Sequence, residues 1–192
     1  VTPTLIVVPM SFSDSQYLEF PPETWSTRWY DNYFGSSEWM QATRTSFKAA
    51  FLTMLVATPI GALAAYGLHC SKVRFIRAAF VLMTTPMMVP VVLVAIGAFY
   101  AYVQLKILYT MTGLVLAHTV LALPLVVIVT GSALKSYDMS QEKAARSLGA
   151  PRWKAFLTVT LPQIRFAVVT SALLAFLTSF DEVVVAMFVS GG

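Results

Sequence analysis

The sequence predicts an all-α membrane protein built as a multi-span helical bundle. Of its 192 residues, 57% are hydrophobic and only 11% are charged, and the mean hydropathy is +0.71. Soluble domains normally carry about 25% charged residues. Several apolar runs also reach the roughly 20 residues that a helix needs to cross a bilayer. The composition therefore excludes a soluble domain and makes the lipid bilayer the first expected partner.

The beginning of the chain is expected to be the end of a first span followed by an outer segment. Residues 1–12 are apolar but shorter than a complete span, and they lack the charged region and cleavage site of a signal peptide. Residues 13–39 are rich in aromatic and acidic side chains. Aromatic rings with polar tips prefer the membrane–water boundary. We interpret these residues as a partly helical surface segment, with a ligand-binding loop as the alternative.

Complete spans are predicted after this segment at residues 42–68, 78–103, 113–134 and 166–189. Prolines interrupt the first three of them, and neighbouring helices can accommodate such breaks. Together with the partial span at 1–12, they predict one transmembrane domain over residues 1–192. We expect roughly five to six spans, of which the first and last are incomplete or absent.

Basic residues predict the orientation of the bundle. Nine of the thirteen Lys and Arg residues lie in the loops at 69–77 and 135–165. The loops on the opposite side carry only Arg28 and Lys106. Since cytoplasmic loops are enriched in Lys and Arg, the loop at 135–165 is predicted to face the cytoplasm.

Residues 140–162 of this loop have the pattern of two short helices. Ser140 is predicted to cap the first helix, and Gly149 to end it in a left-handed conformation. Pro151 fits the first position of a second helix, which Pro162 ends. The pattern alone leaves two interpretations open: a helix–turn–helix parallel to the membrane, or an amphipathic loop that rests on lipid headgroups.

The same stretch resembles the signature loop, often called the EAA loop, of permease subunits in bacterial binding-protein-dependent ABC importers. The resemblance is carried by two alanines, a glycine and an aliphatic–x–Leu–Pro ending, which are Ala144, Ala145, Gly149, Val159, Leu161 and Pro162. Residues 21–34 and 45–66 also look like this family, so the resemblance covers nearly the whole chain. In that family the loop is the coupling helix, which sits in a groove of the ATPase and transmits its closure.

The resemblance implies that an ATPase is coupled to this chain through Glu142, Ala144, Ala145, Gly149, Leu161 and Pro162. One departure concerns the acidic position. The family has Glu directly before the two alanines, where this chain has Lys143, and Glu142 stands one place earlier. We predict that Glu142 takes over the contact to the ATPase, or that the contact is made differently.

The resemblance also implies a fold, a location and partners. The fold would be that of a type I (MetI-like) ABC importer permease in the bacterial inner membrane. Its partners would be ATP-binding cassette ATPase subunits, a second permease subunit in an expected heterodimer, and a periplasmic substrate-binding protein; no nucleic acid is expected. The sequence has no G-x-x-x-x-G-K-[ST] phosphate loop. We therefore expect a transport subunit rather than an enzyme, with no cofactor, metal site or catalytic set, and with ATP and Mg²⁺ bound by the ATPase.

Two carboxylates in the last apolar span narrow the expected substrate. Asp181 and Glu182 follow Ser179 and Phe180, and a charge at mid-membrane costs about 2.5–3.5 kcal/mol or more. The run resembles permeases of the spermidine/putrescine class, which implies a slender polyamine cation. We predict that Ser179, Asp181 and Glu182 line the substrate pathway; the alternative is that Asp181 pairs structurally with a base on a partner subunit. For His118, a hydrogen-bonded contact between helices is preferred to a proton-coupling role.

Two rival functions remain open. The first is an ABC permease for ferric iron, sulfate or another small solute, although an anion fits poorly with Asp181 and Glu182. The second is a secondary transporter or channel subunit without an ATPase, in which His118 and the two carboxylates would be ion-coupling groups. A Walker-motif ATPase and a secreted binding protein encoded alongside this chain would discriminate between the classes.

Overall fold

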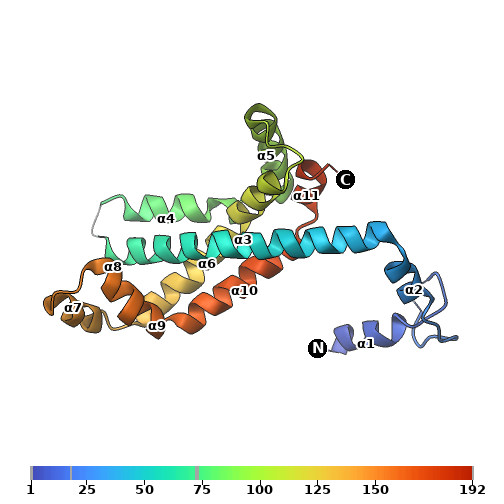
Figure 1. Ribbon diagram of the computed structural model, residues 1–192, viewed down its shortest axis with the longest axis horizontal. Helices are drawn as coiled ribbons and strands as arrows, with labels where there is room; N and C mark the ends of the chain where they lie inside the picture. The colour runs from blue at the N-terminus through green and yellow to red at the C-terminus, as the bar shows by residue number, and fades with distance from the viewer. Residues whose placement is uncertain (1, 18, 72–73, 192) are drawn as a thin grey trace. The chain divides into compact units, whose positions relative to one another are not determined.

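The described residues form helices, as the composition predicts. Figure 1 shows the computed structural model of the chain, which describes residues 2–17, 19–71 and 74–191. In chain order the elements are α1 (Thr2–Met10), α2 (Arg28–Gly35), α3 (Ser37–Cys70), α4 (Ile76–Thr84), the 3₁₀ helix η1 (Thr85–Met87), α5 (Val91–Leu105), α6 (Met111–Ser136), α7 (Ser140–Ser147), α8 (Arg152–Ala155), the π-helix η2 (Phe156–Thr160), α9 (Leu161–Gln163), α10 (Arg165–Asp181) and α11 (Val184–Val189).

The chain divides into two compact units, Val1–Ser46 and Phe47–Gly192. In the first unit, backbone hydrogen bonds join the segment after α1 to the segment before α2: the Ser26 N–H donates to the Phe12 carbonyl at 2.7 Å, and the Asp14 N–H donates to the Thr24 carbonyl at 3.2 Å. Exposed aromatic side chains gather in this unit, among them Tyr17, Trp25, Phe34 and Trp39. Such rings are typical of a segment at the membrane–water boundary.

The core of the second unit is built from small residues that let helices approach closely. Ala57 of α3, Ala122 and Val126 of α6, and Ala175 of α10 form one fully buried cluster. A Cβ atom at Gly61 would lie only 2.5 Å from Cγ1 of Val126, so any other residue there would push α3 and α6 apart. Small residues are the usual means of close helix packing in membranes, where burial in lipid supplies no hydrophobic drive.

Two of the predicted spans are single long helices in the structure. α3 and α6 are each long and apolar enough to cross a membrane. Two bent pairs would each form a further span: Ile76–Met87 with Val91–Leu105 at 99°, and Arg152–Gln163 with Arg165–Asp181 at 81°. The bend in the first pair follows Pro86 and Pro90, where the missing N–H groups interrupt the helical hydrogen bonds.

The last predicted span is not one continuous helix. α10 ends at Asp181, Glu182 has an extended backbone (φ −83°, ψ 100°), and α11 begins at Val184. The reason is local, because the Glu182 carboxylate accepts a hydrogen bond from the Val185 N–H at 3.0 Å and so supports the start of a new helix. The apolar pattern of residues 166–189 contains no signal for this break.

Candidate functional site

The loop between α6 and α10 begins with a capped helix. Sequence reasoning placed the cap of α7 at Ser140, but Ser140 is the first helical residue. The Asp138 carboxylate instead accepts hydrogen bonds from the Ser140 N–H at 2.9 Å and from the Ser140 hydroxyl at 2.6 Å. These two bonds lower the pKa of Asp138. Asp138 therefore supports the start of α7 from outside the helix by accepting its first free N–H, while the N-cap residue is Met139, which makes no side-chain hydrogen bond.

Gly149 ends the first helical segment in the left-handed conformation that the sequence predicts, with φ +93°. Its N–H donates to the Arg146 carbonyl at 3.0 Å, and the Ala150 N–H donates to the Ala145 carbonyl at 3.2 Å. The chain turns between two helices as expected, but Pro151 precedes the first residue of α8 instead of occupying it. Pro162 lies inside α9 (Leu161–Gln163), so the prediction that it ends the second helix was wrong.

The Gly149 conformation supports a first prediction. Gly149→Ala should destabilise the loop by about 1–2 kcal/mol, since the left-handed region is costly for residues with a Cβ, and Gly149→Asn should cost less. No atom lies within 4 Å of a Cβ placed there, so the loss would come from backbone strain alone. Hydrogen exchange of the peptide covering α7 and α8 measures it. Gly67→Ala is the matched control, because Gly67 is helical with equally open surroundings; an equal change in both variants would contradict the prediction.

Glu142 lies inside the chain rather than on the surface of the loop. Its side chain is 1% exposed. The Tyr66 hydroxyl of α3 donates to one carboxylate oxygen at 2.6 Å, and the Thr160 hydroxyl of η2 donates to the other at 2.5 Å. A carboxylate removed from water must have its oxygens satisfied, and these two bonds satisfy both. Glu142 thus joins α7 to α3 and to η2.

Two further residues surround this contact. The Arg152 guanidinium lies over the Tyr66 ring at 5.5 Å from its centroid, and its Nε donates to the Tyr66 hydroxyl at 3.4 Å. The Phe156 ring packs against the Tyr66 ring, with 4.5 Å between centroids. We call Tyr66, Glu142, Arg152, Phe156 and Thr160 the anchor cluster. It fixes the loop between α6 and α10 to the C-terminal end of α3.

The other predicted coupling residues are divided between the surface and the core. Ala144, Gly149 and Pro162 are exposed, Ala145 is half-buried, and Leu161 packs against the core near Leu134 and Ile164. The largest exposed apolar side chains of the loop are Leu148, at 90% exposed, and Trp153, at 67%. Neither residue was predicted as part of the site. Their apolar side chains among the many charged residues of the loop could have indicated them. Contiguous exposed apolar patches are typical of surfaces that contact another protein or a membrane.

The carboxylates of the last span lie where α10 ends. Asp181 is exposed and Glu182 half-buried, and both line a pocket of about 620 Å³ with Leu177, Thr178 and Phe180. The last carbonyls of a helix have no helical partner and carry partial negative charge. Two carboxylates and a helix C-terminus therefore give this pocket a strongly negative character.

Ser179 does not belong to this pocket. It faces the bundle, where its hydroxyl lies 2.7 Å from His118 Nδ1 and donates to the Thr53 hydroxyl at 3.3 Å. The structure therefore separates the three residues predicted to line one pathway, with Ser179 in the core and Asp181 on the other side of α10. The hydrogen-bonded helix contact expected of His118 is present. Its Nε2 has no hydrogen-bond partner within the described part of the chain.

These features define a class of protein: a helical membrane component with an anchored surface loop that exposes apolar side chains, and a negatively charged break in a membrane helix. The chain belongs to the family described as binding-protein-dependent transport system inner membrane component, whose model matches residues 57–192. This match includes the loop, the anchor cluster and the helix break. The MetI-like fold expected from the signature loop is thereby confirmed. No group of three or more His, Cys, Asp or Glu residues able to hold a metal ion occurs among the described residues.

Curated relatives share about a third of the sequence over most of the chain. The spermidine/putrescine transport system permease protein PotC of Haemophilus influenzae is 32% identical over 190 residues, which cover 98% of this chain and 73% of that protein. The putrescine transport system permease protein PotI of Escherichia coli (strain K12) is 32% identical over 196 residues, covering 98% of this chain and 69% of that protein. The molybdenum transport system permease protein ModB of Escherichia coli (strain K12) is 33% identical over 158 residues, covering 76% of this chain and 69% of that protein.

One solved structure has a similar fold. It is the crystal structure of a bacterial ABC transporter involved in the import of the acidic polysaccharide alginate, with a TM-score of 0.60 and 18% sequence identity. The match covers 94% of this chain and 65% of that chain. At this identity the likeness concerns the fold alone, and this chain spans just under two thirds of the length of its structural neighbour.

Proposed function

We propose that this chain is the transmembrane permease subunit of an ATP-driven importer for a polyamine. It would form the translocation pathway with a second, different permease subunit, receive substrate from a periplasmic binding protein, and couple to separate ATPase subunits through residues 140–162. ATP and Mg²⁺ would bind to those ATPases. The observation that carries the substrate assignment is the exposed Asp181 carboxylate at the break between α10 and α11.

The chemistry of the break favours a cation. Non-helical backbone at membrane depth is tolerated where it lines a cavity, and transporters use the ends of broken helices to bind charged substrates near mid-membrane. Here the broken end is a helix C-terminus flanked by Asp181 and Glu182, which would attract an ammonium group and repel an anion. The names of the PotC and PotI relatives agree with a polyamine.

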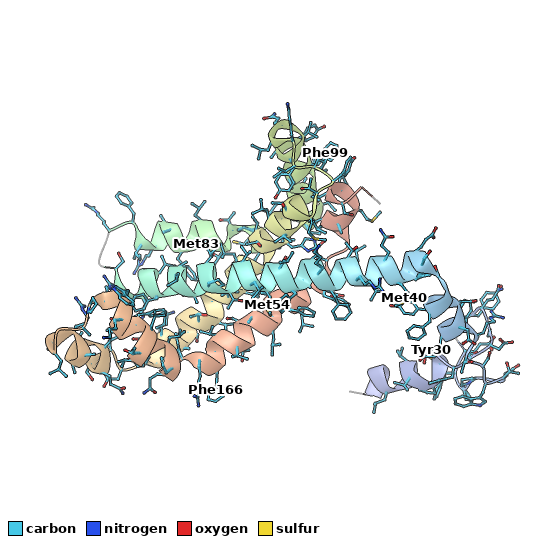
Figure 2. The ribbon with its side chains drawn as sticks, viewed as in Figure 1. Tyr30, Met40, Met54, Met83, Phe99 and Phe166 are labelled. Carbon is cyan, nitrogen blue, oxygen red and sulfur yellow. The ribbon has the colours of Figure 1, made fainter. Side chains whose placement is uncertain are left out.

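The outer face of α10 supports a pathway at a subunit boundary. Exposed apolar side chains follow one stripe of this helix: Phe166, Val169, Leu173, Leu177 and Phe180. Figure 2 shows Phe166 projecting away from the ribbon of α10. Leu177 and Phe180 also line the pocket of Asp181. A second permease subunit packed on this stripe would therefore leave the carboxylate at the edge of the interface.

Uptake of labelled putrescine tests the substrate. The full-length permease, expressed with the ATPase and binding protein encoded beside it, should take up putrescine in a host that lacks polyamine importers. Unlabelled spermidine should compete and molybdate should not. If molybdate competes and spermidine does not, the polyamine assignment is wrong. Uptake that persists when the ATPase's Walker lysine is replaced would rule out ATP-driven transport by this system.

The exposed apolar face of the coupling loop supports a second prediction. Leu148→Asp should weaken the association with the ATPase roughly 30-fold or more, as expected when a central apolar interface residue is lost. The fold should be unaffected, because Leu148 is 90% exposed. Co-purification of the ATPase with the permease measures the effect.

Ser147→Asp is the matched control for this prediction. It adds the same charge at the neighbouring exposed position but removes no apolar contact, so the loss of ATPase should be clearly smaller. Undiminished co-purification of the Leu148→Asp variant, with full ATP turnover, would show that the ATPase docks elsewhere.

A further inference from the structure

A groove with basic residues at one end lies among three helices of the second unit. Its volume is about 370 Å³, and α3, α4 and α6 contribute its walls. α4 runs beside the later part of α3 in Figure 1. The lining residues are Ala65, Leu68, His69, Ile76, Arg77, Phe80, Val81, Val127, Gly131 and Lys135.

The polar lining residues are three bases, and they lie together at one end. His69 is in the last turn of α3, Lys135 is in the last turn of α6, and Arg77 is in the first turn of α4. The distribution of basic residues predicts that these helix ends face the cytoplasm. The one ion pair among the described residues joins Arg28 and Asp14, so no described carboxylate neutralises Arg77 or Lys135.

The remainder of the groove is apolar and runs toward the interior of the membrane. Val127 lies about 12 Å further along α6 than Lys135, at 1.5 Å per residue. Gly131 lies between them and has no side chain to fill the groove. The nearest atom to a Cβ placed there would be the Ala65 Cβ, at 4.0 Å. The groove volume of about 370 Å³ has room for roughly a dozen methylene groups, if each occupies about as much space as a water molecule.

We infer that this groove is a binding site for one anionic phospholipid of the inner leaflet. The phosphate would bind between Arg77 and Lys135, with His69 beside it, and one acyl chain would lie along Phe80, Val81 and Val127. Basic side chains at a membrane surface attract anionic headgroups, and an apolar groove that continues into the bilayer fits the chain of the same lipid. A soluble anion would use the bases but leave the apolar walls exposed.

Lipid retention by the full-length protein tests the site. The protein is reconstituted in nanodiscs with phosphatidylglycerol or with phosphatidylcholine of the same acyl chains, extracted in mild detergent, and examined by native mass spectrometry. One phosphatidylglycerol should be retained per chain, and phosphatidylcholine should not. Equal retention of both lipids would overturn the assignment of the phosphate to the basic end.

Charge-matched variants test the headgroup end. Each membrane-adjacent base contributes about a fivefold factor in affinity, so Arg77→Gln with Lys135→Gln should weaken phosphatidylglycerol binding about 30-fold. Lys154→Gln with Arg165→Gln removes the same charge from other exposed positions on the same side of the protein and should have little effect. Equal losses in the two double variants would mean a diffuse surface charge and no site.

Size-matched variants test the acyl-chain end. Val81 lines the groove, and its neighbour Leu82 does not; both are exposed, at 58% and 75%. Val81→Trp should fill the groove and abolish retention, whereas Leu82→Trp should leave it unchanged. Thermal unfolding of each variant checks that the fold is intact. Retention in the Val81→Trp variant, or its absence in the unmodified protein because another subunit covers the groove, would refute the site.

Discussion

Glu142→Ala is expected to abolish coupled transport while leaving the permease in the membrane. The substitution removes both acceptors from the buried hydroxyls of Tyr66 and Thr160. Each buried hydroxyl left without a partner costs roughly 1–3 kcal/mol, so the loop should lose about 2–6 kcal/mol of local stability. Hydrogen exchange in residues 140–165 should rise accordingly, and the ATPase should keep basal turnover but lose stimulation by substrate.

A double-mutant cycle distinguishes this internal role from a direct ATPase contact. If Glu142 acts through Tyr66, then Tyr66→Phe should reproduce part of the Glu142→Ala effect, and the pair should show a coupling energy of about 0.5–3 kcal/mol. If Glu142 instead contacts the ATPase, the two substitutions should be additive, and Tyr66→Phe alone should leave coupling intact. Lys143→Gln is a useful comparison, because Lys143 is exposed at the next position.

Asp181→Asn is expected to reduce polyamine transport about 10- to 100-fold. The substitution keeps the shape of the side chain but removes the charge that would pair with a substrate ammonium, and hydrogen bonds to charged groups contribute about 1.5–3 kcal/mol. The free carboxylate of Asp181 lines the pocket at the helix break. Putrescine uptake measured over a range of concentrations gives the loss, and basal ATP turnover should not change.

Glu182→Gln is the comparison for this prediction and should have a smaller effect. One oxygen of Glu182 already accepts the Val185 N–H, and the Gln carbonyl can replace it there. If Asp181→Asn transports putrescine normally, Asp181 does not line the pathway, and pairing with a base on a partner subunit becomes the better interpretation.

The long helices and the turn of the coupling loop were predictable because their signals are local. The apolar length of α3 and α6, and the glycine followed by proline at Gly149 and Pro151, act within a few residues. The burial of Glu142 was not predictable in this way. Its partner Tyr66 lies 76 residues earlier in the chain, and only the packing of α7 against α3 brings the two together.

The break after Asp181 and the separation of Ser179 from it were also not predicted, for two different reasons. Residues 166–189 are mostly apolar, so their pattern predicts one span, but the Glu182 carboxylate accepts a hydrogen bond from the Val185 N–H and a new helix begins there. Ser179 and Asp181 are neighbours in sequence, but two positions along a helix differ by about 200° around its axis. The sequence analysis put Ser179 and Asp181 on one surface because they are close in sequence, but the helix places them on opposite sides.

The straight helix α3 connects the anchor cluster to the core beside the helix break. Thr53 accepts a hydrogen bond from Ser179, and Tyr66 donates one to Glu142. The two α3 residues are 13 positions apart, or about 20 Å along the axis and about 220° around it. The Thr53–Ser179 and Tyr66–Glu142 contacts therefore lie on nearly opposite sides of α3. A sideways shift of α3 that shortens one contact should lengthen the other. We therefore expect that a displacement of the Tyr66 end of α3 would also disturb the contact between Thr53 and Ser179 of α10.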